Sequence, residues 1–140
     1  MKKFHTLSLF VLLLLSGSIA KAQNNSLISD TVCTSVVSDT LTAAIANAVI
    51  PYSDVDLYFY ATGDLASSSE YFDIYSETGG YIGRFFGTAD CGPYESNLFT
   101  VPKDSFALWA GNGEVQFTIF PSVEVNVCSP YLCTYFKAEF

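Results

Sequence analysis

Histidine is nearly absent from this chain, since the only one among 140 residues is His5, close to the N-terminus. A domain that follows this segment has no imidazole, which excludes Ser-His-Asp and Cys-His catalysis and any histidine-ligated zinc site. Basic residues are also scarce, with six Lys and Arg against 14 Asp and Glu. Nucleic acid and anionic lipid are bound largely through Lys and Arg at phosphates, so we expect neither partner.

Long apolar runs are lacking apart from one at the N-terminus. Residues 1–22, MKKFHTLSLFVLLLLSGSIAKA, contain two early lysines, an apolar run at 7–15 and the small-x-small sequence Ala20-Lys21-Ala22. This order is typical of a cleaved secretory signal peptide, so the mature chain is predicted to start near Gln23. A retained anchor is the weaker interpretation, because a membrane-spanning helix needs roughly 20 apolar residues. We expect a secreted, cell-surface or periplasmic protein without a membrane span after cleavage.

Cleavage changes the composition of what remains. The mature chain has 140 − 22 = 118 residues, which suits one domain at 31–140 after a polar lead-in at 23–30 that is poorly ordered. Three basic and all 14 acidic residues remain, so the formal charge becomes 3 − 14 = −11. Such acidity keeps an exported protein soluble, and a dedicated cation-binding surface is the alternative.

Cysteine pairs with CxxC spacing are lacking as well. The four cysteines are Cys33, Cys91, Cys128 and Cys133, and only the last two are near each other. A zinc site made of four thiolates needs closely spaced pairs, whereas an even number of cysteines in an exported chain is typical of disulfides. The sequence therefore predicts two disulfide bonds.

No segment after residue 22 has the apolar stripe of a helix, although 105–110 has room for one turn. Instead, β-branched and aromatic residues alternate with polar ones between recurrent turn residues. The clearest alternating runs are 40–45, 54–60, 71–75, 115–119 and 132–140. The pattern predicts an all-β fold of about eight strands, as a two-sheet antiparallel β-sandwich of the jelly-roll or CUB-like kind.

Tyrosines and carboxylates occupy the outward positions of two predicted strands. They are Asp54, Asp56, Tyr58 and Tyr60 on the first and Tyr71, Asp73 and Tyr75 on the second. If both strands belong to one sheet, these groups share a face that suits a sugar, because rings stack on a pyranose and acids accept hydrogen bonds from its hydroxyls. Tyrosine also suits protein partners, since its ring gives contact area at low entropy cost. The alternative is that tyrosine is simply a favourable strand residue. The candidate ligand-binding residues are Tyr58, Tyr60, Tyr71, Asp73 and Tyr75.

Oxygen ligands are what this acidic domain offers to a metal ion, which makes calcium the metal to consider. The candidate ligands are Asp54, Asp56, Asp64 and Glu70, with Asp73 as a further one. No EF-hand or RTX spacing is present, and scattered acidic residues are usually just solvated. No other cofactor is expected. Carboxylate pairs of the kind used in glycoside hydrolysis are too abundant here to indicate an enzyme, and Trp109 is more typical of a core or rim anchor than of a ligand platform.

The chain from about Leu41 to Phe140 resembles a module that recurs in exported bacterial proteins. The resemblance rests on Gly63-Asp64-Leu65, residues 69–75 (SEYFDIY), Gly80-Tyr81-Ile82-Gly83, Cys91-Gly92, Trp109 before Gly113, and residues 121–128 (PSVEVNVC). It implies a non-catalytic β-sandwich. A weaker resemblance, through residues 70–75, 83–85 and 91–92, is to the CUB domain, an extracellular β-sandwich of which some members hold calcium.

The resemblance to the exported module also implies a disulfide pairing. Its pattern has counterparts of Cys91 and Cys128, which leaves Cys33 and Cys133 as an added pair. The added pair joins the first and last strands, and chain termini often lie close together in a compact domain. Closing that long loop stabilises the fold by about 4 kcal/mol on the chain-entropy model. A local bond between Cys128 and Cys133 is the alternative.

Together these features predict an exported, non-catalytic binding module whose partner is an extracellular protein or a glycan. One alternative is a structural or extracellular-matrix component without a specific small ligand. Another is a calcium-stabilised, CUB-like adhesion domain.

Overall fold

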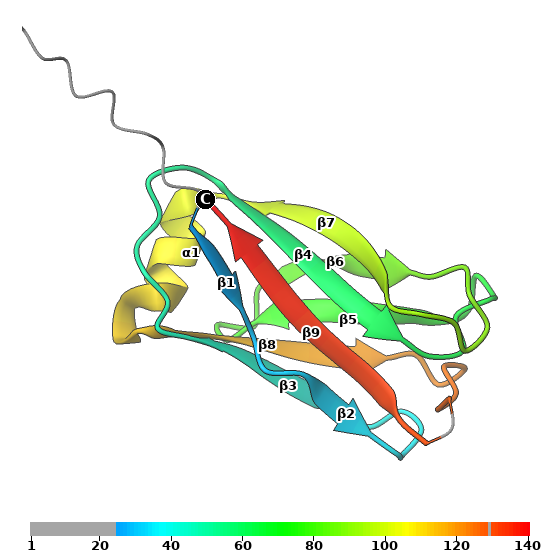
Figure 1. Cartoon of the computed structure of the whole chain (residues 1–140). Coiled ribbons are helices and arrows are strands. Elements are labelled where there is room, and N and C mark those ends of the chain that lie inside the picture. Colours follow the sequence, from blue (N-terminus) through cyan, green and yellow to red (C-terminus); the bar gives the residue numbers. More distant parts are fainter. Residues whose placement is uncertain (1–24, 129) are drawn as a thin grey trace, which may run out of the picture.

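The computed structural model describes residues 25–128 and 130–140, which form nine strands in two antiparallel sheets. The five-stranded sheet contains β1 (Ser26–Ile28), β2 (Val32–Thr34), β4 (Val55–Thr62), β7 (Glu95–Val101) and β9 (Leu132–Glu139). The four-stranded sheet contains β3 (Leu41–Ala46), β5 (Tyr71–Ser76), β6 (Tyr81–Phe86) and β8 (Glu114–Pro121). The helix α1 (Lys103–Trp109) and a 3-10 turn (Ala110–Asn112) lie at one end, beside the C-terminus (Figure 1). The predicted all-β two-sheet sandwich is confirmed, and the predicted signal peptide, residues 1–22, lies outside the described residues.

The last strand of the chain occupies the middle of the five-stranded sheet. β9 pairs with β4 on one side and with the short strands β1 and β2 on the other. In the four-stranded sheet the order is β3-β8-β5-β6. β1 lies within residues 23–30, which the sequence suggested to be a poorly ordered lead-in. That expectation is wrong for Ser26–Ile28, because three residues are too few to show a strand pattern and pairing with β9 holds them.

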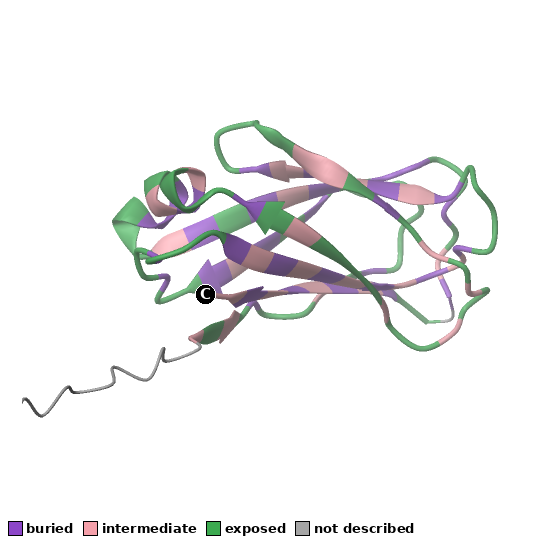
Figure 2. Cartoon of the chain, turned by 90° about the horizontal axis from the view of Figure 1, so that it is seen from above, coloured by how far each residue is buried: buried purple, intermediate pink, exposed green. Residues whose placement is uncertain are grey.

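The core lies between the sheets and is rich in phenylalanine. Buried and half-buried residues alternate along β4 and β9, which gives the central strands the banding seen in Figure 2. The ring of Phe59 contacts those of Phe72, Phe85 and Phe136 at centroid distances of 5.6, 5.3 and 5.0 Å. These four rings come from both sheets, so their packing holds the two layers together. Each such buried side chain contributes on the order of 2 kcal/mol of apolar transfer free energy.

The helix α1 covers the end of this core. Its Phe106 and Trp109 are buried, and the ring of Trp109 contacts the ring of Phe117 at 6.4 Å. Trp109 is thus a core residue. The backbone N–H of Lys103, in the first turn, donates a hydrogen bond to the Asp54 carboxylate at 3.0 Å. An acceptor at this position satisfies one of the free N–H groups with which every helix begins.

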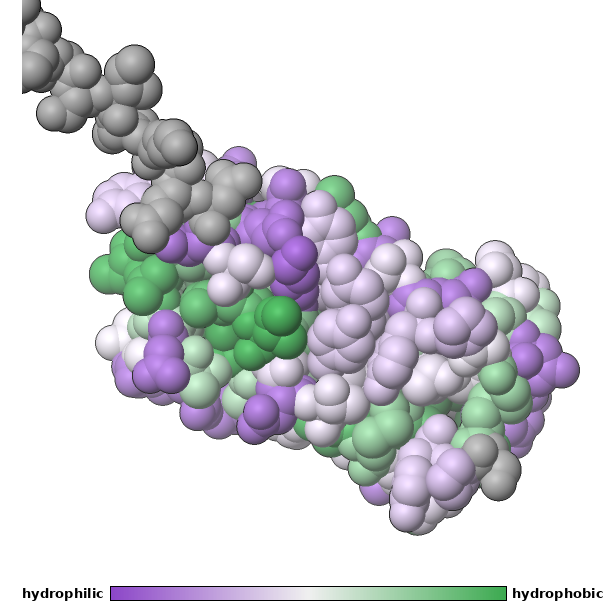
Figure 3. All heavy atoms as spheres, in the orientation of Figure 1, coloured by the Kyte–Doolittle hydropathy of each residue, from purple (hydrophilic) through white to green (hydrophobic). Residues whose placement is uncertain are grey.

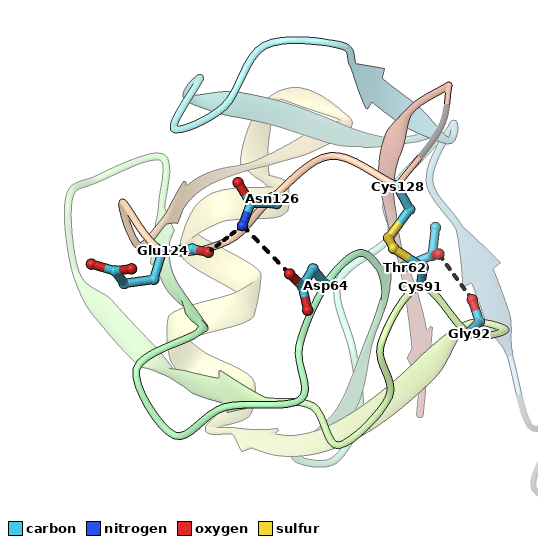
Figure 4. The surroundings of a disulfide bond; sticks show 7 residues. All are labelled: Thr62, Asp64, Cys91, Gly92, Glu124, Asn126 and Cys128. Carbon is cyan, nitrogen blue, oxygen red and sulfur yellow. Dashed lines mark hydrogen bonds between the residues drawn. A yellow bond between two sulfur atoms is a disulfide. The ribbon is translucent and has the colours of Figure 1, made fainter.

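Both expected disulfides are present, as Cys33–Cys133 and Cys91–Cys128. Cys33 and Cys133 are directly opposite each other in the pairing of β2 with β9. Cys91–Cys128 joins the loop before β7 to the loop after β8, close to Thr62 (Figure 4). The alternative bond between Cys128 and Cys133 is excluded. Two disulfides indicate an oxidising compartment, extracellular or periplasmic. No helix in the described ranges is long and apolar enough to cross a membrane.

The two disulfides should differ in their contribution to stability. Cys33–Cys133 spans a sequence separation of 100 residues and Cys91–Cys128 one of 37. On the chain-entropy model the longer loop adds about 1 kcal/mol more to the free energy of unfolding. Urea unfolding of the Cys33→Ser/Cys133→Ser and Cys91→Ser/Cys128→Ser double variants should show the larger loss for the first. A larger loss for the second would contradict this expectation.

Candidate functional site

The two rows of predicted ligand-binding residues lie in different sheets. β4, with Tyr58 and Tyr60, pairs with β7 and β9, whereas β5, with Tyr71, pairs with β6 and β8. The condition for a shared face, that both strands belong to one sheet, is therefore not met. Alternation correctly shows which residues of a strand point away from the core, but sheet membership depends on pairing between distant segments.

On the outer face of the five-stranded sheet, tyrosines pack against one another. The rings of Tyr60 and Tyr135 stack at 4.4 Å with an interplanar angle of 2°, and the ring of Tyr94 meets Tyr135 edge-on. Burial raises the pKa of Tyr135, with Tyr60 and Tyr94 as smaller causes. Lys137 lies 5.9 Å from the ring centre of Tyr58. Figure 3 shows this face covered mainly by weakly hydrophilic side chains, with strongly hydrophobic ones gathered towards the α1 end.

The outer face of the four-stranded sheet carries a cluster of five rings, here called the aromatic face. Its members are Tyr71, Tyr75, Tyr81, Phe86 and Phe120. Strand register brings them together: Tyr75 is opposite Tyr81, and Tyr71 is opposite Phe86. The ring of Tyr75 meets those of Tyr81 and Phe120 edge-on at 5.3 and 5.5 Å. Tyr81, Phe86 and Phe120 are 56%, 52% and 43% exposed, so these three residues are accessible to a ligand.

An ion pair lies among these rings. Arg84 donates two hydrogen bonds of 2.7 Å to the Asp73 carboxylate, one from Nε and one from an η nitrogen, and the Tyr81 hydroxyl donates a third at 3.3 Å. The Arg84 guanidinium also lies over the ring of Tyr71, 3.7 Å from its centre. Hydrogen bonding from Arg84 is the main reason that the pKa of Asp73 lies below its ordinary value. Asp73 is therefore an ionised acceptor held in place by a bidentate cation.

Beside this ion pair the surface forms a hollow of about 490 Å³ at the start of β5 and the end of β8. Its lining comprises Ser69, Tyr71, Asp73, Phe120, Pro121, Ser122, Val123 and Glu124. The Ser122 hydroxyl donates a hydrogen bond to the carbonyl of Ser69 at 2.8 Å and accepts one from the N–H of Tyr71 at 3.2 Å. These two bonds hold the three residues together in the wall of the hollow. The Glu124 carboxylate points away from Asp64 and Asn126 (Figure 4). The residues that line the hollow thus include two aromatic and two acidic ones.

The chain matches no protein-family model, no curated protein and no solved structure. The resemblances to the exported module and to the CUB domain therefore stay predictions.

The predicted metal ligands are not assembled into one site. Asp54 is bonded to the first turn of α1, and Asp56 lies on the outer face of β4. Asp64 accepts a hydrogen bond from the Asn126 amide at 3.4 Å (Figure 4), and Glu70 accepts one from the Ser67 N–H at 2.6 Å. Within residues 25–128 and 130–140, no three His, Cys, Asp or Glu residues are grouped so as to hold a metal ion. Three of these four carboxylates instead serve local hydrogen bonds.

Four residues of the aromatic face and its ion pair were not among the site residues predicted from the sequence. They are Tyr81, Arg84, Phe86 and Phe120. A signal for three of them was present, because the tight turn at 78–80 predicts a hairpin that pairs residues 81–86 with the tyrosine row of the preceding strand. Phe120 carries no such signal, since β8 joins β5 from a distant part of the chain.

Replacing Asp73 with asparagine should lower the free energy of unfolding near neutral pH by up to about 1 kcal/mol, the usual limit for a partly exposed pair. The folded pKa is lowered from an unfolded value of about 3.9. The stabilisation that ionised Asp73 gives is therefore complete at pH values above the unfolded pKa. It is lost as the pH falls through the folded pKa. Urea unfolding of both proteins at neutral and acidic pH should show the difference shrinking in acid.

Asp30→Asn is the control for this measurement, because Asp30 is exposed in the loop between β1 and β2. It should change stability less than Asp73→Asn at neutral pH. A deficit of Asp73→Asn that stays the same in acid would contradict an ionised, paired Asp73.

Proposed function

We propose that this protein is an exported, non-catalytic binding module whose ligand is an uncharged carbohydrate. The observation that carries the proposal is the hollow whose lining includes the aromatic residues Tyr71 and Phe120 and the acidic residues Asp73 and Glu124. A sugar ring has apolar C–H faces and a rim of hydroxyls, so it matches walls of this mixed composition. The volume of about 490 Å³ lies in the range of ordinary small-ligand sites.

The charges around the hollow support a neutral rather than an acidic sugar. Among the described residues, Arg84 is the only basic residue on the aromatic face. Asp73 already neutralises its charge through two hydrogen bonds. Glu124 adds a negative charge to the lining. A uronic or sialic acid would therefore bring its carboxylate towards like charge without a free cation, which disfavours binding.

A role without catalysis is supported by the composition of the site. The sequence after residue 22 has no histidine to act as a general base. Asp73 is held ionised by Arg84, whereas a carboxyl that donates a proton in glycoside hydrolysis needs a raised pKa. Export is supported by the predicted signal peptide and by the two disulfides.

Tyr71→Ala and Phe120→Ala should each weaken sugar binding at least tenfold, or by about 1.4 kcal/mol, because each removes a ring from the hollow. A glycan array on the mature protein would find the ligand, and isothermal titration calorimetry would measure its affinity for each variant. Tyr58→Ala is the matched control, since Tyr58 is equally half-buried but lies on the outer face of the other sheet. It should leave the affinity unchanged.

Three results would contradict the proposal. One is binding confined to acidic glycans, and another is an equal loss of affinity in the Tyr58→Ala control. The third is that no glycan on the array is bound and the protein self-associates in solution, which would favour the structural alternative.

A further inference from the structure

A second hollow, of about 360 Å³, lies beyond the opposite end of β5. It is bounded by the β5–β6 hairpin, the end of β7 and α1, so it borders both sheets. Leu108 and Trp109 form apolar parts of its wall, and Thr78 and Ser105 contribute hydroxyls. No residue of its lining carries a charge at neutral pH. In so acidic a chain, such a lining favours an uncharged ligand with both apolar and hydroxyl-bearing surfaces.

Three rings connect this hollow to the one described above. Tyr81 lines the second hollow and contacts Tyr75, and Tyr75 contacts Phe120, which lines the first hollow. Because these residues belong to β6, β5 and β8 respectively, the row crosses the sheet rather than following one strand. The centroid separations of 5.3 and 5.5 Å are comparable to the length of one pyranose unit in a chain.

We infer that the ligand is a linear chain of neutral sugar units that runs from the first hollow over Tyr75 and Tyr81 into the second. This inference rests on the proposed function and specifies its ligand. A site for one terminal sugar would need only a single hollow. Here two hollows are joined by rings, of which Tyr81 and Phe120 are about half exposed, so successive units of one chain have successive surfaces to contact.

Calorimetry with neutral linear oligosaccharides of increasing length tests this arrangement. The probes are glucose, mannose, galactose and xylose homo-oligomers of one to six units. For the series that binds, affinity should rise at least tenfold from the monosaccharide to the tetrasaccharide and then level off. A single ring-and-carboxylate site would show no such rise.

Variants locate the two ends of the bound chain. Leu108→Ala should weaken binding of the hexasaccharide several-fold and leave the monosaccharide unaffected. Tyr81→Ala should weaken the hexasaccharide more than the monosaccharide, whereas Tyr71→Ala should weaken both. Tyr81→Phe keeps the ring but removes the hydroxyl that bonds to Asp73, so it should retain most of the affinity for the hexasaccharide. Tyr60→Ala, on the other sheet, should change neither affinity.

The possible failures are distinguishable. If affinity depends on Tyr71 but not on oligomer length or Tyr81, the inference is overturned and the proposed function stands. If an apolar glycoside binds through Leu108 while chain length has no effect, the second hollow is a separate site and the inference is again overturned. If no oligomer of any series binds, both the inference and the proposed function fail.

Discussion

The packing of β9 against its neighbours is the interaction on which the rest of the structure depends. This strand supplies Phe136, whose ring stacks on Phe117 of the other sheet at 4.2 Å and contacts Phe59 beside it at 5.0 Å. It also pairs with β4 and with both short N-terminal strands, and it carries Cys133. The five-stranded sheet therefore depends on β9 for the link between β4 and the N-terminal strands. Most of its stabilising pairings are non-local, as is typical of slowly folding sandwiches.

The candidate site is a consequence of this core. Because alternate residues of β5 and β8 are committed to the phenylalanine core, the intervening residues must face outward, where no other element of the described residues covers them. Their rings are then grouped by strand register and supported by edge contacts with one another. The Asp73–Arg84 pair places polar groups among these rings and covers one side of Tyr71. A face of this kind offers a ligand both polar groups and exposed ring surface.

Local patterns in the sequence predicted β3, β4, β5, β8 and β9 but not β1 or β7, and non-local pairing limited the prediction of the site. Alternation showed that Tyr71, Asp73 and Tyr75 point away from the core, and the structure agrees. It did not show that Tyr58 belongs to another sheet, because hydrophobic periodicity is the same whichever neighbours a strand has. Phe120 was missed for the same reason. β1 was missed because its three residues are held by pairing with β9, and no sequence pattern of that length is specific.

The side of the sandwich near the second hollow is closed by one close approach between the sheets. A Cβ at Gly83 of β6 would collide with the ring of Phe99 of β7, so only glycine lets that ring lie against the backbone of β6. Phe99 in turn packs against the core at the edge where the two sheets come together. β6, β7 and α1 also contribute residues to the lining of the second hollow. Gly83 thus permits the close approach of the two sheets on the side where the second hollow lies. It belongs to the same strand as Tyr81 of the aromatic face and Arg84 of its ion pair.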